Sequence, residues 1–213
     1  MRKRDLEILS TLEKFKVMDS KMIAALHFSS NADPLKTANR VLKRLRQDGY
    51  IQANTDRPFQ HYLYYLNPSA IKINSAKLDH HLMIGQTYVD MLSYDRKTSF
   101  EVERKLEGAD FISDGFADWL GRKWFIECQN SLFSTKQLSD KLDKYKSFYE
   151  KGFIEKFPNV LIIGKLNMQF NREEYPFKIS QVNSIHDLKG NIEKYKQKKT
   201  PVNKTPGIYF KMK

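Results

Sequence analysis

The chain has 213 residues, a formal net charge of +12 and one cysteine, Cys128. A chain of this length fits two modest domains, and a single cysteine excludes an internal disulfide, as is usual in a reducing cytoplasm. There is no run of about 18 apolar residues and no apolar signal core after the charged start, so we expect a cytoplasmic protein with no membrane partner.

The positive charge is concentrated at the two ends of the chain. Lysine and arginine outnumber aspartate and glutamate by 13 to 7 in residues 1–73 and by 8 to 1 in residues 189–213, whereas residues 74–188 carry 16 against 17. Fields of this kind attract nucleic acid and make its binding sensitive to salt. The distribution therefore indicates an anionic partner for the ends and a neutral middle.

The first two predicted helices are short and amphipathic. Residues 5–17 place apolar side chains at helical spacing, which predicts a helix that packs behind the next two; these are Leu6, Ile8, Leu9, Leu12 and Phe15. Before it, Arg2, Lys3 and Arg4 could add phosphate contacts or could belong to a frayed end. Ser20 can cap a second helix over residues 21–26, with Met22, Ile23 and Leu26 as its apolar stripe.

Residues 34–49 predict one strongly amphipathic helix, which Asp33 can cap, Pro34 can start and Gly49 can end. Its core face would be Leu35, Ala38, Val41, Leu42 and Leu45. Its opposite face carries Lys36, Thr37, Asn39, Arg40, Lys43, Arg44, Arg46 and Gln47. Together with residues 21–26 this predicts a helix-turn-helix whose second helix could contact phosphates and base edges. A solvated basic face is the alternative.

Residues 50–53 and 59–66 predict two strands joined by a turn at residues 54–58. The segment "VLKRLRQDGYI" followed by "YLYYL" resembles the winged-helix DNA-binding superfamily, which implies duplex DNA as the partner. The candidate DNA contacts are Lys36, Thr37, Asn39, Arg40, Lys43 and Arg44 on the helix, and Arg57, Gln60 and His61 on the wing. Some winged helices bind proteins instead, so a protein-interaction module stays open.

The remainder predicts a bridging helix at about 75–93 followed by an α/β unit. His80 and His81 are neighbours on that helix and point in different directions, so we expect packed or hydrogen-bonded histidines instead of a metal pair. The later elements are strands at residues 100–106, 111–120, 123–129 and 159–164, helices at 134–151 and 185–197, a short strand at 177–180, a hairpin turn at 121–122 and a basic tail at 200–213. This order predicts a β-hairpin followed by a helical crossover connection to the next strand.

Acidic residues gather on these strands. Asp114 and Glu127 could approach each other across the hairpin, and Gln129 shares the face of Glu127. Glu101 or Glu103 on the preceding strand is a further candidate member. The arrangement resembles the PD-(D/E)XK nuclease superfamily, which implies Mg²⁺ held by Asp114 and Glu127. The catalytic residues implied are Asp114, Glu127, Gln129, Glu103 and Lys141.

Gln129 stands where that superfamily has a lysine, and Lys136, Lys141 or Lys144 on the next helix could substitute for it. The alternative is a degenerate nuclease fold kept as a scaffold, in which Asp114 caps a turn and Glu127 pairs with a helix lysine.

A second resemblance covers the chain from the winged helix to about Tyr149. The succession "LDHHLMIGQTYVDML", "ISDGFADWL", "KWFIECQN" and "LSDKLDKYKSFY" is similar to the replication-relaxation family of bacterial plasmids and other mobile elements. The pattern of that family is matched by His80-His81-Leu82 and by Lys141 with Tyr145, whereas Ser113 replaces its proline and Gln129 its second acid. The resemblance implies a mobile-element context, plasmid replication and relaxation of plasmid DNA.

We therefore predict an α+β protein with a winged helix-turn-helix at residues 1–73, an α/β domain resembling the restriction-endonuclease-like fold at 74–199, and a tail at 200–213. The favoured function is sequence-specific binding of double-stranded DNA by a plasmid, phage or conjugative-element protein that controls replication, transfer or transcription. It would act without a cofactor, as a homodimer on a palindromic site, and its second domain would dimerise or bind a replication or transfer protein. The alternative is a Mg²⁺-dependent nickase or endonuclease targeted by the winged helix.

Overall fold

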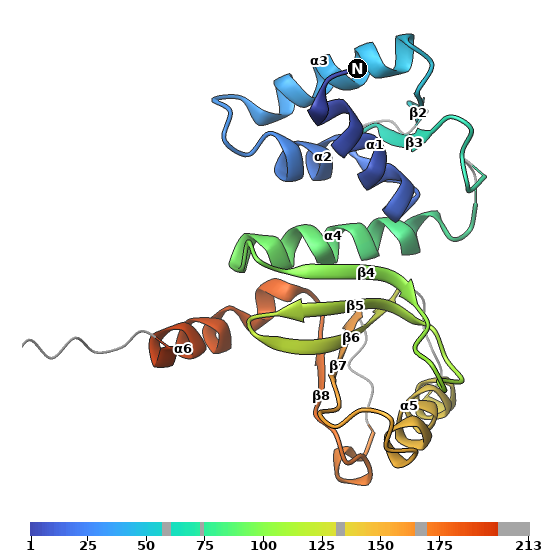
Figure 1. Ribbon diagram of the computed structural model, residues 1–213, viewed down its shortest axis with the longest axis vertical. Coiled ribbons are helices and arrows are strands. Elements are labelled where there is room, and N and C mark those ends of the chain that lie inside the picture. Colours follow the sequence, from blue (N-terminus) through green and yellow to red (C-terminus); the bar gives the residue numbers. More distant parts are fainter. Residues whose placement is uncertain (57–60, 73–74, 131–134, 165–169, 200–213) are drawn as a thin grey trace, which may run out of the picture.

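The computed structural model describes residues 1–56, 61–72, 75–130, 135–164 and 170–199. It is a mixed α+β structure, as the sequence predicts: helices with a small antiparallel sheet come first, and a five-stranded mixed sheet with helices follows. The helix α4 (Leu78–Tyr94) lies between these two parts (Figure 1).

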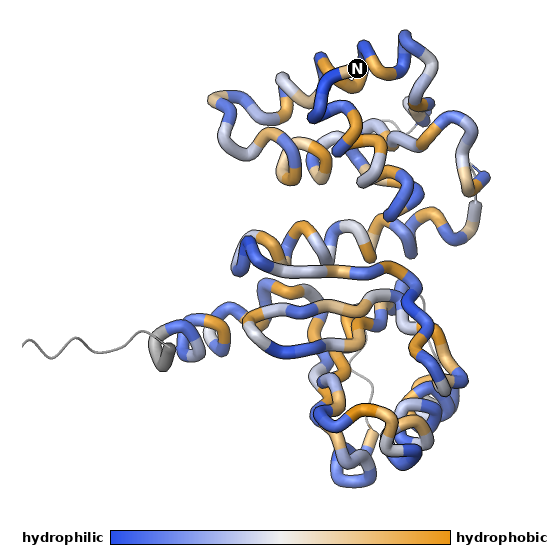
Figure 2. The backbone as a smooth tube through the Cα atoms, in the orientation of Figure 1, coloured by the Kyte–Doolittle hydropathy of each residue, from blue (hydrophilic) through white to orange (hydrophobic). Residues whose placement is uncertain are grey.

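The first part consists of α1 (Lys3–Phe15), α2 (Ser20–His27), α3 (Pro34–Gln47) and three short strands. The strands are β1 (Met18–Asp19), β2 (Ile51–Asn54) and β3 (Leu63–Leu66), paired antiparallel in the order β1-β3-β2. Hydrophobic and hydrophilic residues alternate along α1 and α3, as expected of amphipathic helices (Figure 2). Their apolar sides meet in one core, which includes Ile8, Leu12, Phe15, Ile23, Leu42 and Leu45.

Several local predictions for this part were wrong. Asp19 caps α2, because its carboxylate accepts a hydrogen bond from the Met22 amide at 2.8 Å, so Ser20 is the first residue of the helix and not its cap. Leu6 is 52% exposed and does not join the core. Tyr64 and Tyr65 are both buried, so β3 does not alternate as predicted; it is the central strand of its sheet and is covered on both faces.

The helix α4 is buried on two sides, which ties the two parts together. On one side Gly85 leaves room for the side chains of Met18 and Met22, which lie 3.4 and 3.5 Å from the position that a Cβ would take. On the other side, the Trp119 indole donates a hydrogen bond to the Met91 carbonyl at 3.1 Å. Buried residues therefore occur around most of its circumference.

The second part is a sheet in the order β4-β5-β6-β7-β8, with antiparallel pairs up to β6 and parallel pairs beyond it. Its strands are β4 (Ser99–Arg104), β5 (Ser113–Trp119), β6 (Arg122–Gln129), β7 (Asn159–Gly164) and β8 (Ile179–Val182). The helix α5 (Thr135–Glu150) connects β6 to its parallel neighbour β7, which confirms the predicted hairpin and crossover. The hairpin turns at Leu120 and Gly121, one residue earlier than predicted; both have positive φ, as a two-residue turn requires.

The two faces of this sheet are covered by different helices. Along β6, Trp124, Ile126 and Cys128 belong to the core on the α4 side, whereas Phe125 packs with α5. By the two-residue period of a strand, Glu127 and Gln129 therefore face α5. Around β8 lie the 3-10 turns Arg172–Glu174 (η1) and Ile185–Leu188 (η2), and the described residues finish with the helix α6 (Lys189–Lys199), close to the predicted terminal helix.

Candidate nucleic-acid interface and carboxylate cluster

The helix α3 presents a cationic face to solvent. Asp33 caps it by accepting a hydrogen bond from the Lys36 amide at 2.9 Å, and Pro34 occupies its first turn. Its buried residues are Ala38, Leu42 and Leu45, and its exposed ones are Lys36, Asn39, Arg40, Lys43, Arg46 and Gln47. Within the described part of the chain, none of the four exposed cations forms an ion pair. The helix thus carries positive charge that no acidic side chain in the described ranges pairs with.

Two members of the predicted DNA-contact set are used inside the protein. The Arg44 guanidinium lies 2.6 Å from the carboxylate of Asp5, which is only 1% exposed. Burial by itself would raise the pKa of Asp5, but the hydrogen bonds from Arg44 and from the Arg2 amide lower it below its usual range. Thr37 is partly buried, and its hydroxyl donates to the Asp33 carbonyl at 2.8 Å. Arg44 therefore connects α3 to α1, and Thr37 closes the first turn of α3.

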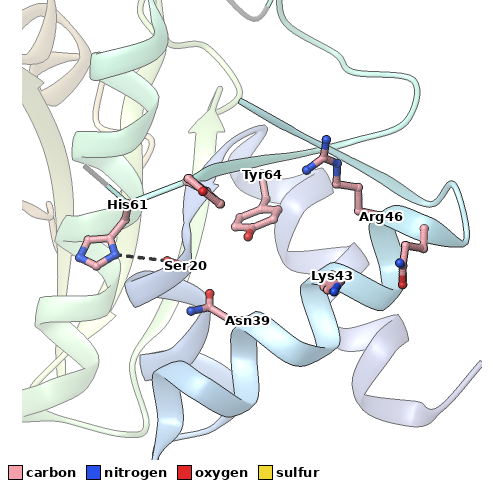
Figure 3. A pocket seen from close by; sticks show the side chains of 8 residues that line it. Ser20, Asn39, Lys43, Arg46, His61 and Tyr64 are labelled. Atoms are coloured by element: carbon pink, nitrogen blue, oxygen red, sulfur yellow. Dashed lines mark hydrogen bonds between the residues drawn. The ribbon is translucent and has the colours of Figure 1, made fainter. Parts of the chain in front are cut away.

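A groove of about 790 Å³ runs between α3 and the strand β3 (Figure 3). Its lining residues are Ser20, Asn39, Lys43, Arg46, Gln47, His61, Tyr62 and Tyr64. The His61 Nδ1 atom lies 3.4 Å from the Ser20 hydroxyl, and Asn39 lies beside them at one end of the groove. The structure thus brings together helix and wing candidates, and adds Tyr62, which is 50% exposed and which the sequence analysis missed. Arg57 and Gln60 lie outside the described residues.

The predicted carboxylate cluster lies between α4, β5, β6 and α5. One oxygen of Asp114 accepts a hydrogen bond from the Cys128 amide at 2.8 Å, and the other lies 3.3 Å from the His80 Nε2 atom. The hydrogen bond to Asp114 raises the pKa of His80. Burial would raise the pKa of Asp114, but His80 and Lys141 lower it overall. Asp114 is thus held by a strand amide and a helix histidine.

Glu127 is 2% exposed and both of its oxygens accept hydrogen bonds, one from Lys141 and one from the hydroxyl of Tyr145. Burial raises the pKa of Glu127 to about 8. Burial by itself would lower the pKa of Lys141, but the negative charges of Glu127 and Asp114 raise it above its usual value. This pairing of Glu127 with a helix lysine is the arrangement that the scaffold alternative predicts.

The other two predicted strand members, Glu103 and Gln129, have different surroundings. The Glu103 carboxylate pairs with Lys16 at the end of α1, and its own backbone has a φ of 50°. Gln129 is 5% exposed on the same face as Glu127, and its side-chain amide has no hydrogen-bond partner among the described residues. Among the described residues, neither side chain forms a hydrogen bond with Asp114 or Glu127.

The arrangement does not fit the Mg²⁺ site that the nuclease resemblance implies. All four carboxylate oxygens of Asp114 and Glu127 face a protein donor, and two of those donors are cationic or can become so. Across the described ranges, no group of three His, Cys, Asp or Glu residues could hold a metal ion. A divalent cation would therefore have to displace Lys141 and His80 first.

The sequence analysis expected His80 to be packed or hydrogen-bonded, which the structure confirms, and it assigned Tyr145 only to a family pattern. Both side chains contact the carboxylates directly. The signal that could have found them is the pattern itself, which matched His80 on one helix and Lys141 with Tyr145 on another. All three converge on Asp114 and Glu127.

The model of the Replication-relaxation family matches residues 9–160, more than half of the chain. The chain belongs to the replication-relaxation family. Membership implies a role in the control of plasmid replication, and it confirms the resemblance drawn from the sequence. The matched segment includes the α3 groove and the whole carboxylate cluster, since both lie within its bounds. No curated protein matches the chain.

Among the helices in the described ranges, none is both long and apolar enough to cross a membrane.

Proposed function

We propose that this member of the replication-relaxation family binds duplex DNA of a plasmid or other mobile element through α3, as part of replication control. The observation that carries the proposal is the exposed face of α3, where Lys36, Arg40, Lys43 and Arg46 have no ion-pair partner among the described residues. Uncompensated cations on a rigid helix suit phosphates, and the interleaved amide of Asn39 suits an adenine edge.

In this proposal α3 enters the major groove and the β2–β3 hairpin acts as a wing beside it. Asn39, Arg40 and Lys43 contact base edges or the flanking phosphates. His61 lies across the groove from α3. In the proposed complex it contacts the phosphate backbone of the DNA, together with the predicted contacts Arg57 and Gln60. The helix is held rigid by its buried core residues and by the Arg44–Asp5 pair, so little order has to be gained on binding.

The five-stranded sheet then serves as a scaffold. The internal pairing of Glu127 with Lys141 and of Asp114 with His80 supports a role other than metal-dependent cleavage. We propose that this part dimerises or binds a replication or transfer protein. A dimer would place two α3 helices on a palindromic site, about one helical turn of DNA apart.

Binding of a mixed-sequence duplex of about 30 base pairs, roughly three turns, tests the proposal by fluorescence anisotropy at low salt. The variant Arg40→Ala/Lys43→Ala should weaken binding about tenfold, since binding to such a duplex depends on cations that neutralise phosphates and the variant removes two of them. The charge-matched control Lys123→Ala/Lys156→Ala removes two exposed cations from the sheet part and should bind like the wild type. Equal affinities of the two double variants would contradict the proposal, and so would a wild-type protein that does not bind.

A further inference from the structure

A second groove, of about 590 Å³, lies between α3 and the first turn of α1. Its lining residues are Arg2, Lys3, Arg4, Asp5, Glu7, Phe28, Asn31, Thr37, Arg40, Val41 and Arg44. It shares none of them with the groove beside β3, where α3 contributes Asn39, Lys43, Arg46 and Gln47. The exposed ridge of α3 therefore lies between two grooves, and Arg40 faces the one formed with α1.

The start of α1 is fixed to α3 by a single buried carboxylate. One oxygen of Asp5 accepts a hydrogen bond from the Arg2 amide at 2.8 Å, and the other accepts from the Arg44 guanidinium at 2.6 Å. The Arg4 guanidinium lies over the Phe28 ring, 5.1 Å from its centre. The basic run at residues 2–4 is therefore an ordered wall of the groove. This differs from the frayed end that the sequence left open.

The charges of this groove point to an anionic occupant. Asp5 is taken up by Arg44, whereas Arg2, Lys3, Arg4 and Arg40 are exposed and form no ion pair within the described ranges. Glu7 is the other acid in the lining. A cluster of cations beside α3, which we propose enters the major groove, suits the phosphates along one edge of that groove, because the two sugar-phosphate backbones flank a helix bound there.

We propose that this α1–α3 groove is a second DNA contact, which binds the phosphate backbone of one strand while α3 occupies the major groove. Asp5 acts as the positioning residue, since it holds the basic run against α3 without contacting DNA. The inference rests on the proposed function of α3 and adds a surface to it, so that the footprint of the protein extends to the side of α3 away from the wing.

The salt dependence of duplex binding tests this inference. Each lost phosphate contact reduces the slope of log K against log salt by about 0.9. The variant Arg2→Ala/Lys3→Ala/Arg4→Ala should reduce that slope by about 2 to 3 for a mixed-sequence duplex of about 30 base pairs. The charge-matched control Lys97→Ala/Lys123→Ala/Lys156→Ala, with three exposed lysines of the sheet part replaced, should leave the slope unchanged.

A second variant distinguishes the positioning role of Asp5 from the effect of net charge on DNA binding. Asp5→Asn retains every cation and makes the protein more positive, so a purely electrostatic effect would tighten binding. If Asp5 positions the basic run, this variant should bind the same duplex more weakly, with circular dichroism confirming its fold.

The outcomes distinguish the two proposals. A triple variant of residues 2–4 with the wild-type slope, in a protein whose Arg40→Ala/Lys43→Ala variant loses binding, would overturn this inference and leave the function of α3 standing. A wild-type protein without salt-dependent binding would overturn both.

Discussion

Lys141 of α5 donates a hydrogen bond to the buried carboxylate of Glu127 on β6. In the same cluster, the imidazole of His80 on α4 faces the carboxylate of Asp114 on β5. Two side chains that can carry positive charge thus face two carboxylates, which matches the charge that one divalent cation would supply. In the site that resembles a nuclease centre, the negative charge of the two carboxylates is therefore balanced by side chains of the protein itself.

Removal of Lys141 should therefore destabilise the fold. In Lys141→Met, Glu127 would stay 2% exposed without its cation. Above the Glu127 pKa of about 8, where the wild-type pair is ionised, loss of one partner from a buried pair costs about 3 kcal/mol, the lower end of the range because the Lys141 side chain is 28% exposed. Urea denaturation followed by circular dichroism measures the change.

The double variant Glu127→Gln/Lys141→Met is the matched control for this prediction. It removes the buried charge together with its partner, so it should recover a large part of the loss, because well-packed neutral replacements of a buried pair are often tolerated. Additive losses would show that the two residues stabilise the fold independently.

The His80–Asp114 pair should stabilise the protein mainly in mildly acidic solution. The pKa of His80 is raised, so its contribution is complete below the unfolded value of about 6.5 and is lost as pH rises through the folded value. The pKa of Asp114 is lowered, so its contribution is present above about 3.9 and is lost as pH falls through the folded value.

Between about pH 4 and pH 6.5, His80→Gln should therefore be least stable relative to the wild type, and the gap in free energy of unfolding should narrow above that range. An NMR titration of the His80 imidazole should give a pKa above that of a free histidine, and Asp114→Asn should lower it. A His80 that titrates at or below the free value would refute the pairing.

Supercoiled plasmid should remain intact when it is incubated with the protein and Mg²⁺ or Mn²⁺, because the oxygens of Asp114 and Glu127 already have protein donors. Agarose gels measure nicking directly. Nicking by the wild type that disappears in Glu127→Ala, while duplex binding persists, would support the nuclease alternative instead.

Gly115 of β5 should not tolerate a side chain. A Cβ there would lie 2.4 Å from the ring of Phe100, which is itself packed against Phe15 of α1 and Tyr88 of α4. Because that ring has no room to move, Gly115→Ala should cost about 1–3 kcal/mol of unfolding free energy. Gly190→Ala on α6, where nothing lies within 4 Å of the added atom, is the control and should be neutral or slightly stabilising.

Elements with a strong period could be predicted from the sequence, and contacts between distant residues could not. The apolar run at residues 159–164 gave the bounds of β7, and the amphipathic pattern of α3 gave its buried face. The exposed position of Asn39, Arg40 and Lys43 followed from that same pattern, because a helix with one apolar stripe must turn its other side to solvent.

The partners of the charged residues depend on the tertiary fold. The helical spacing of α3 places Arg44 on the same face as the DNA-contact candidates. Its partner Asp5 lies 39 residues earlier in the sequence and reaches it only because the start of α1 lies beside α3. In the same way, His80 finds Asp114 only because α4 covers the sheet. Periodicity in one segment contains no information about which acid a cation will meet.

Directed cleavage of bound DNA tests the central claim, that the outward face of α3 lies in a duplex. Cys128 is 3% exposed and burial raises the pKa of its thiol, so an iron chelate should attach only to an introduced cysteine. The chelate is attached to Asn39→Cys, and a duplex that the protein binds is first selected from a pool of random sequences. Because the chelated iron cuts only the DNA near it, we predict cleavage confined to a short stretch of the bound site. The control Lys156→Cys should give only background. Background cleavage from Asn39→Cys while the duplex remains bound, or equal cleavage from both positions, would contradict the account.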